Sequence, residues 1–275
     1  MYTLNCKGKL LVIDKPVVMG IINITPDSFY EGSRKQSIKD IVEVAAAMLA
    51  DGAAILDIGG QSTRPGSERL HTEQEKQRVL PAIEAIIAAY PDAIISIDTY
   101  NAAVAEEAVQ AGAAIVNDIS SGDMDEAMLP TVANLKVPYI CMHMQGTPDN
   151  MQQHPQYTDV TAQVLDYLAQ KADACKRAGI NDIIIDPGFG FGKTIEHNFT
   201  LLRQLSAFKI LNCPVLAGLS RKSTVYKTLG TTAENALNGT TVLNTIALLN
   251  GADILRVHDV KAAAEAITLF KKYEV

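Results

Sequence analysis

Residues 51–57 read D-G-A-A-I-L-D, and this short stretch decides the fold of the chain. Gly52 follows an amphipathic Ala/Leu-rich segment, which is where a helix commonly ends on a glycine in the left-handed conformation. The apolar run 54–57 then begins a strand. The same pattern, in which a helix ends at a glycine and a strand begins directly after it, occurs three more times, at Gly112, Gly179 and Gly251.

Eight short apolar runs, rich in β-branched residues, occur along the chain, and almost all of them end in a polar residue. A strand that is buried on both faces reads as a continuous apolar run, which is typical of a parallel sheet. The runs are 17–23, 54–57, 94–98, 114–118, 138–143, 182–186, 214–220 and 252–258.

The segments between these runs have apolar residues three and four positions apart, which predicts amphipathic helices. They are 38–50, 73–90, 102–111, 125–134, 158–178, 197–207, 235–250 and 261–272. Eight β-then-α units predict the α/β class and a (β/α)8 TIM barrel, whereas a doubly wound sheet would usually have fewer strands and a glycine-rich first turn. Residues 4–6 and 10–13, which flank Lys7-Gly8-Lys9, predict a short N-terminal β-hairpin over the floor of the barrel.

Length and composition limit the function. A chain of 275 residues fits one barrel domain over residues 1–275. No window approaches the roughly 20 apolar residues of a membrane span, and the apolar run 10–13 is too short for a signal peptide. Four cysteines without a CxxC pair are typical of a reduced, cytoplasmic protein.

The charge of the chain favours a small-molecule substrate. A formal net charge of −7 argues against nucleic acid as a partner, because nucleic-acid binding needs a basic stripe. Basic residues nevertheless gather near predicted strand ends, at Arg64, Arg221, Lys222 and Arg256. Such a cluster in an acidic protein predicts an anionic small molecule as substrate.

Two segments resemble common motifs but depart from them. Residues 188–194 (GFGFGKT) fail the P-loop pattern because Pro187 stands where its first glycine is needed, and they also fail GxGxxG. We interpret these glycines as a sharp turn over the barrel mouth. Cys141 and His143 alternate on one predicted strand, but without a third Cys or His nearby we interpret them as a core thiol beside a hydrogen-bonded histidine.

Three polar side chains end neighbouring predicted strands, namely Asp98, Asn117 and Asp186. Because the carboxyl ends of barrel strands meet at the active-site end, we expect these side chains to form a wall of hydrogen-bonding groups. A carboxylate can accept two adjacent N–H groups, so the wall fits a flat heterocycle such as a 2-amino-4-oxo pteridine or a guanine. Asp118 is interpreted instead as a helix N-cap, the usual role of a lone Asp after a strand.

Basic side chains follow the last two predicted strands. Arg256 and His258 are two positions apart and therefore point to the same side, so we interpret them as a phosphate clamp across the mouth from the acidic wall. The alternative is a pair of rim residues in surface salt bridges. Lys222 could reach a ring carbonyl or a developing charge, whereas Arg221 is interpreted as a scaffold or rim residue.

Two long polar loops follow the first two predicted strands, at 23–29 (NITPDSF) and 59–67 (GGQSTRPGS). Their proline and glycine content is typical of mobile lids, and the alternative is a solvated connector. A Phe and a Thr-Arg-Pro are unusual in a passive turn, so we interpret both loops as parts of the site.

Motifs at these strand ends, in order along nearly the whole chain, carry a family resemblance. They are NITPDSF (23–29), GQSTRPG (60–66), SID (96–98), NDI (117–119), Met142-His143, DPGFGFG (186–192), SRKS (220–223) and RVHD (256–259). This set resembles the dihydropteroate synthases of folate biosynthesis, and the pair NxTPDSF and STRPG is highly specific. The chain departs from the family's common residues at Ile24, Gln61 and Thr224, none of which has an assigned role.

The resemblance implies that 7,8-dihydropterin-6-ylmethyl diphosphate and p-aminobenzoate react, with Mg²⁺, to give 7,8-dihydropteroate and diphosphate. It implies that Asp98, Asn117, Asp186 and Lys222 hold the pterin ring, that Met142 and Phe191 line its pocket, and that Arg256 stacks on the ring and contacts the diphosphate. Asn23, Thr63, Arg64 and His258 would serve the diphosphate and its metal, with Asn23 as the metal ligand. Thr63, Pro65, Phe191, Lys222 and Ser223 would border the aminobenzoate, where sulfonamides compete in this family, and Gly218 and Asp27 complete the substrate-binding set.

The chemistry of these substrates predicts the mechanism. An aromatic amine is already nucleophilic at pH 7, so we expect no dedicated base and a dissociative loss of diphosphate that cations stabilise. The two loops would close afterwards to exclude water, with Asp27 and Arg64 as an ion pair that orders them.

The resemblance also implies a homodimer, formed through helices on the side away from the two loops. Two alternatives to the synthase remain open. A methyl-tetrahydrofolate methyltransferase shares the fold and the pterin pocket, but it needs no STRPG motif, diphosphate clamp or metal, and it expects a corrinoid partner. A non-catalytic pterin-binding paralogue is expected to have lost Asn23, Lys222, Arg256 or His258, and all four are present.

Overall fold

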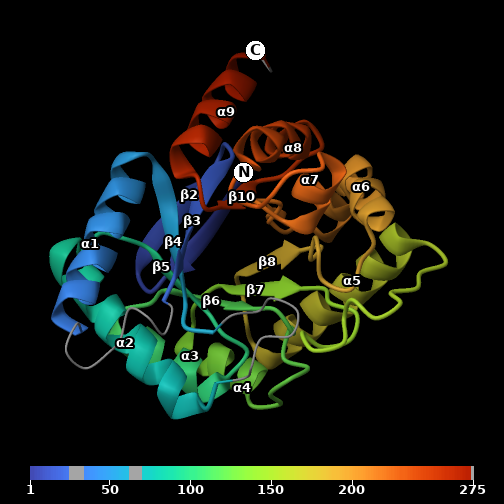
Figure 1. The fold of residues 1–275 in the computed structure, drawn as a ribbon. Helices are drawn as coiled ribbons and strands as arrows, with labels where there is room; N and C mark the ends of the chain where they lie inside the picture. The colour runs from blue at the N-terminus through green and yellow to red at the C-terminus, as the bar shows by residue number, and fades with distance from the viewer. Residues whose placement is uncertain (25–33, 62–69, 274–275) are drawn as a thin grey trace.

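The computed structural model describes residues 1–24, 34–61 and 70–273, and its centre is a barrel of eight parallel strands (Figure 1). Around the barrel the strands follow the order β8-β7-β6-β5-β4-β3-β10-β9. A parallel bridge between Ile185 and Val215 joins β8 to the chain just before β9, so the sheet closes on itself. The strands are β3 (Val17–Asn23), β4 (Ala53–Gly59), β5 (Ile95–Asp98), β6 (Ile115–Asp118), β7 (Tyr139–Met142), β8 (Ile183–Asp186), β9 (Leu216–Ala217) and β10 (Ile254–Val257). The predicted (β/α)8 barrel is therefore confirmed.

Helices surround the strands in chain order (Figure 1). Eight of them match the predicted amphipathic segments, and these are α1 (Arg34–Ala50), α2 (Thr72–Ala89), α3 (Ala102–Ala111), α4 (Met128–Leu135), α5 (Val160–Ala178), α6 (Ile195–Arg203), α8 (Leu237–Leu249) and α9 (Val260–Tyr273). The four glycines predicted to end helices, Gly52, Gly112, Gly179 and Gly251, have φ values of 100°, 128°, 97° and 93°. Two short helices were not predicted, namely the 3-10 helix η2 (Leu205–Leu211) and α7 (Ser223–Thr228).

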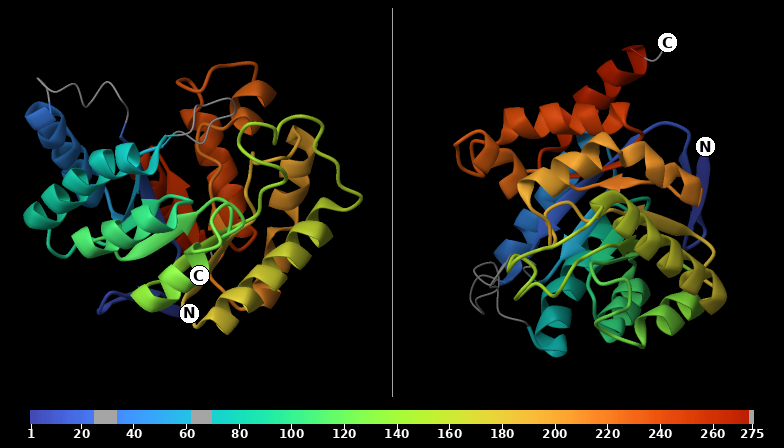
Figure 2. Two further views of the ribbon diagram at one scale, coloured as in Figure 1. Left: turned by 90° about the horizontal axis from the view of Figure 1, so that it is seen from below. Right: turned by 90° about the vertical axis from the view of Figure 1, so that its right-hand side faces the viewer.

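The apolar core has two layers, one inside the barrel and one between the strands and the helices. Side chains alternate along each strand, so that Ile55 packs inside the barrel while Leu56 and Ile58 pack against the helices. The N-terminal strands β1 (Tyr2–Cys6) and β2 (Lys9–Ile13) form an antiparallel hairpin whose Leu4 and Ile13 join the inner layer. The hairpin therefore covers the end where the strands begin, as predicted (Figure 2). The polar residues Asp98 and Asp186 end their strands at the opposite end.

Two local predictions were wrong. Strand β9 contains only Leu216 and Ala217 rather than 214–220, because Pro214 has no N–H and the Val215 N–H donates to the Asp253 carboxylate at 2.8 Å. Asp118 caps no helix, since α4 begins only at Met128. Its carboxylate instead closes a tight turn by accepting the backbone N–H groups of Ser120 and Gly122.

Among the described residues, no helix is both long enough and apolar enough to cross a membrane.

Candidate active site

The predicted acidic wall lies at the carboxyl ends of the strands. Asp98 ends β5, Asn117 is the third residue of β6 and Asp186 ends β8. Asn117 and Asp186 are each only 5% exposed, because the apolar runs that precede them hold their backbones inside the barrel. The sequence therefore placed three hydrogen-bonding groups correctly at one end of the fold.

Arg256 occupies a position that the sequence did not predict. Its Nη2 atom lies 2.5 Å from Oδ2 of Asp98, and its Nε atom donates to Oδ2 of Asp57 at 2.6 Å. The expectation that a cationic side faces the acidic wall across the mouth was wrong for this residue, because Arg256 lies within the wall. Strand β10 pairs with β3 next to β4, and the long side chain spans the barrel interior to reach both carboxylates.

Asp57 is a site residue that sequence reasoning missed. It is fully buried in β4, and besides Arg256 it accepts hydrogen bonds from Nδ2 of Asn117 at 3.2 and 3.4 Å. The signal was present, since the run 54–57 ends in an aspartate just as the run 94–98 does.

Lys222 and Asp186 are oppositely charged residues of the site that influence each other electrostatically. Lys222 donates to the Phe189 carbonyl, and its Nζ atom lies 4.7 Å from the centre of the Phe191 ring. A Cβ atom added at Gly218 would lie 3.6 Å from this Nζ atom and 4.0 Å from Oδ2 of Asp186. Gly218 thus keeps open the space between the amine and the carboxylate, which fits its predicted place in the substrate-binding set.

Burial shifts the pKa values of these groups. It raises the pKa of Asp98 to about 7, with the Arg256 guanidinium acting in the opposite direction. It also raises the pKa of Asp186, against the effect of Lys222. Burial lowers the pKa of Lys222 to about 8, although Asp186 opposes this shift. Each charged form is therefore costly in the free protein, and a ligand that pairs with it would relieve the cost.

His258 follows β10 and contacts the neighbouring strand end. Its Nδ1 atom lies 3.0 Å from Oγ of Ser220, which follows β9 and also accepts the His258 backbone N–H at 3.2 Å. Ser223, the last residue of the SRKS motif, is the first residue of α7. Ser220 therefore fixes the orientation of His258, a role that sequence reasoning did not assign to it.

Met142 and Phe191 belong to a small apolar cluster at the same end of the barrel, separate from the two larger layers. Both side chains are less than a tenth exposed. They place apolar surface at the same end of the barrel as the polar wall, and their role in lining a pterin pocket stays a prediction.

Asn23 ends β3 with an exposed side chain. A Cβ atom added at Gly59 would lie 3.7 Å from both Oδ1 of Asn23 and Oδ2 of Asp98, so these two oxygens approach the same point. The described part of the chain contains no group of three or more His, Cys, Asp or Glu side chains that could hold a metal ion. Magnesium commonly takes only one or two protein oxygens and completes its shell with water and substrate phosphate, so an exposed carboxamide oxygen fits it.

Four predicted site residues, Asp27, Thr63, Arg64 and Pro65, lie outside the described residues.

Arg221 turns away from the mouth. It contacts the Asp259 carboxylate through Nε and Nη2 at 2.8 Å each, and its Nη1 atom donates to the backbone carbonyls of Ala233 and Glu234. Its interpretation as scaffold is confirmed, and the residue fixes the chain segment before α8.

Lys193 is a second buried residue that the sequence did not indicate. It is 3% exposed, and its Nζ atom lies 2.9 Å from Nδ1 of His143. The interpretation of His143 as a hydrogen-bonded core histidine is confirmed, as is that of Cys141 as a buried free thiol.

Comparison with known proteins agrees with this geometry. The family model described as "Pterin binding enzyme" matches residues 19–258. The chain belongs to the pterin-binding enzyme family. Among curated members, the dihydropteroate synthase of Escherichia coli strain K12 is 43% identical over 263 residues, which is 95% of this chain and 93% of the relative.

Solved structures in the family superpose over almost the whole chain. The dihydropteroate synthase of Yersinia pestis, solved with a sulfonamide drug, has a TM-score of 0.93 and 39% identity, and the match covers 99% of both chains. The Xanthomonas albilineans enzyme in complex with 7,8-dihydropteroate has a TM-score of 0.89 and 37% identity, with 100% of this chain and 99% of that chain covered.

Proposed function

We propose that this chain is a dihydropteroate synthase, which joins 7,8-dihydropterin-6-ylmethyl diphosphate to p-aminobenzoate and releases 7,8-dihydropteroate and diphosphate. One observation carries the proposal. The pterin-recognition residues of the motifs (Asp98, Asn117, Asp186 and Lys222) converge on one barrel mouth, in a chain that matches dihydropteroate synthases over nearly its full length.

The polar wall would bind the pterin edge. Carboxylates accept the adjacent N–H groups of the 2-amino-pyrimidinone ring, and each charge-assisted hydrogen bond is worth about 1.5–3 kcal/mol. Lys222 donates to a ring acceptor, while Met142 and Phe191 cover the ring faces. A ring that lacks these donors would leave a buried charge unpaired, which gives the site its specificity.

Departure of diphosphate is the slow event in the proposed mechanism. The aromatic amine needs no base, because it is neutral and nucleophilic at pH 7. The carbon–oxygen bond to diphosphate breaks first, and the positive charge left on the pterin methylene is spread over the ring beside Asp98 and Asp186. Arg256 and His258 stabilise the charge on the leaving group, which is electrostatic catalysis.

Magnesium fits this proposal through Asn23, whose exposed carboxamide lies at the same mouth. When bound there, Mg²⁺ would supply neutralisation of charge on the diphosphate. The remaining ligands would come from the substrate and water.

Diphosphate release, measured on mixing both substrates with Mg²⁺, tests the function. We expect release that needs both substrates, together with formation of 7,8-dihydropteroate. A methyltransferase would release no diphosphate and would require a corrinoid protein. A non-catalytic paralogue would bind pterin without turnover, and either of these two results would contradict the proposal.

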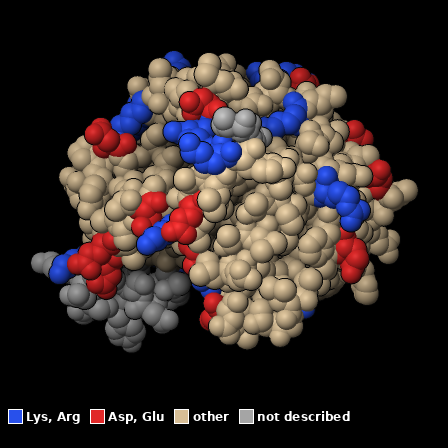
Figure 3. All heavy atoms as spheres, turned by 90° about the horizontal axis from the view of Figure 1, so that it is seen from above, with Lys and Arg blue, Asp and Glu red and all other residues tan. Residues whose placement is uncertain are grey.

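We also propose that the chain acts in the cytoplasm on small molecules. All four cysteines are free and buried, which suits a reducing compartment. On the face shown in Figure 3, acidic and basic side chains are interspersed among neutral ones. This distribution favours small-molecule substrates over nucleic acid, which requires a basic stripe.

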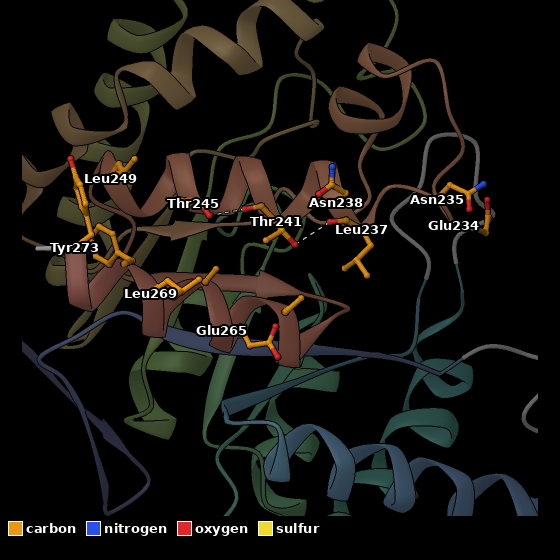
Figure 4. Close-up of a pocket in the computed structure, with 13 residues that line it drawn as sticks. Glu234, Asn235, Leu237, Asn238, Thr241, Thr245, Leu249, Glu265, Leu269 and Tyr273 are labelled. Atoms are coloured by element: carbon orange, nitrogen blue, oxygen red, sulfur yellow. Dashed lines mark hydrogen bonds between the residues drawn. The ribbon is translucent and has the colours of Figure 1, made fainter.

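A homodimer formed through α8 and α9 is the assembly that we propose. A groove of about 810 Å³ lies between these helices, and its lining side chains are drawn in Figure 4. Leu249, Leu269 and Tyr273 in this groove are 53%, 72% and 77% exposed, although they are large and apolar. A second copy of the chain is the occupant that we propose, because an exposed apolar patch commonly marks a protein interface and the groove lies on the outer helices α8 and α9.

Light scattering tests this assembly. We expect the mass of a dimer for the wild type and that of a monomer for Leu269→Lys, which places a charge in the groove. The control Lys39→Glu changes the charge of an exposed residue on α1 and should remain dimeric. A monomeric wild type would contradict the proposal.

A further inference from the structure

Asp57 and Asp98 both bind Arg256, but they differ in access. The side chain of Asp57 is 0% exposed, whereas those of Asp98 and Arg256 are 10% and 17% exposed. A ligand that enters the mouth can therefore reach Asp98 and Arg256 but not Asp57. The Arg256 guanidinium donates through Nη2 to Oδ2 of Asp98 at 2.5 Å.

We propose that Asp57 is a positioning residue that keeps the Arg256 guanidinium in the barrel mouth while Asp98 exchanges that guanidinium for the pterin. The inference rests on the proposed function, because it takes the pterin edge as the ligand of Asp98. It assigns the two carboxylates different roles, since one is a permanent partner of Arg256 and the other an exchangeable one.

The exchange follows from competition for Oδ2 of Asp98. A carboxylate that accepts two adjacent ring N–H groups presents both oxygens to the ring, so a ring N–H group and Nη2 of Arg256 would share Oδ2. We therefore expect the contact between Nη2 of Arg256 and Oδ2 of Asp98 to lengthen when pterin binds. A buried guanidinium left without a partner is strongly unfavourable. Asp57 prevents this, because its Oδ2 atom lies 2.6 Å from both Nε and Nη2 of Arg256.

Asp57 also orients the pterin wall. Nδ2 of Asn117 donates to both of its oxygens, which points the Asn117 carbonyl oxygen away from Asp57 and leaves it available as an acceptor. One buried carboxylate thus fixes both a cation and a carboxamide of the site, and neither task requires contact with the substrate.

Asp57→Asn tests the proposal through two ligands. With no carboxylate at position 57, Arg256 must keep Asp98 as its partner, so the Kd of 6-hydroxymethyl-7,8-dihydropterin should rise by at least about 10-fold. The Kd of the pterin diphosphate should rise less, because the diphosphate offers Arg256 a new partner. At saturating pterin diphosphate, the KM of p-aminobenzoate should change by less than about 2-fold, because we expect Asp57→Asn to leave the rest of the fold intact.

Asp118→Asn is the matched control, since Asp118 is equally buried, ends β6 two strands away from β4, and has Ser120, Gly122 and Tyr139 as its hydrogen-bond partners. It should leave the Kd values of both ligands unchanged. In an Arg256→Gln background, Asp57→Asn should have little further effect on the Kd of the pterin, because the partner that Asp57 holds is absent. If Asp57 had only a structural role, Asp57→Asn would weaken binding of both ligands equally, and its effect would add to that of Arg256→Gln. That result would overturn the inference.

A measurement on the wild type covers the case in which Asp57→Asn does not fold. In a crystal of the chain with bound 6-hydroxymethyl-7,8-dihydropterin, Nε of Arg256 should remain hydrogen-bonded to Asp57 while Nη2 has left Asp98. An Arg256 that has left Asp57 as well, or has kept Asp98, overturns the inference. If the wild type binds no pterin at all, the proposed function fails instead.

Discussion

The Nζ atom of Lys193 lies 2.9 Å from the Nδ1 atom of His143, beneath the glycine-rich loop that carries Phe191. The same Nζ atom donates to the backbone carbonyls of Gly188 and Phe191 at 3.0 Å each, and to that of His143 at 3.3 Å. Burial lowers the pKa of Lys193, but three carbonyl acceptors match the three N–H groups of an ammonium, which favours the charged form. Burial and this cation lower the pKa of His143 to about 3, so its imidazole is neutral.

Lys193→Met should therefore destabilise the protein and loosen the loop that carries Phe191. Three buried carbonyls each lose the hydrogen bond from Lys193, so we expect the unfolding free energy to fall by about 2–4 kcal/mol. The pterin KM should rise as Phe191 loses its fixed position. Urea unfolding and steady-state kinetics measure the two effects. Lys176→Met, which alters an exposed lysine on α5, should change the unfolding free energy by less than about 0.5 kcal/mol. Equal stability of both variants would contradict the role of Lys193.

The alkaline limb of the activity profile should report Lys222. Burial lowers its pKa to about 8, so the ammonium that binds the pterin is lost as pH rises through 8. Because kcat/KM reports ionisations of the free enzyme, it should fall above pH 8. Lys222→Arg retains its charge at high pH, so its alkaline limb should move upward even if activity at pH 7 is reduced. Circular dichroism at pH 9 excludes unfolding as the cause. If the wild type and Lys222→Arg lost activity at the same alkaline pH, a group other than Lys222 would be responsible.

The fold was predictable because periodicity and glycine position are local properties. Each apolar run and each helix-ending glycine depends on a few neighbouring residues, and Gly52 and Gly179 adopt the positive φ that their context requires. The site was predictable at Asp98 and Asp186 because a strand end fixes where such a side chain points. The partner of Arg256 was not predictable, because its long side chain reaches two strands that are distant in the sequence. Lys193 was missed for the same reason, since the carbonyls that bind it come together only in the folded loop.

Gly188→Ala should lower the unfolding free energy by more than the strain of a positive φ alone. Gly188 has a φ of 71°, and an added Cβ atom would lie 1.9 Å from the His143 carbonyl oxygen, so the loop would have to move. Gly230 is the matched control, because its φ is 63° but an added Cβ atom would meet nothing within 4 Å. We expect Gly230→Ala to lower unfolding free energy by about 1–2 kcal/mol, the usual cost of a left-handed L-residue. Gly188→Ala should cost clearly more in the same urea titration and should also raise the pterin KM. Equal costs would show that the loop yields without strain.

Glu75 should make stability depend on pH in a way that Glu75→Gln removes. This residue of α2 is 2% exposed, and burial raises its pKa to about 7 from 4.5, against the effects of Thr99 and Arg78. Since the unfolded chain loses this proton near pH 4.5 and the folded chain only near pH 7, folding keeps a proton over that interval. The unfolding free energy contributed by Glu75 therefore falls as pH rises from about 4.5 to 7 and is constant above. A pKa shift of this size corresponds to at most about 3 kcal/mol of unfolding free energy.

Urea unfolding at pH 5 and pH 8 tests this dependence. The unfolding free energy of Glu75→Gln relative to that of the wild type should be higher at pH 8 than at pH 5. Glu84→Gln, on the same helix and exposed, should show no such gain, and a gain common to both variants would mean that burial of Glu75 is not the cause.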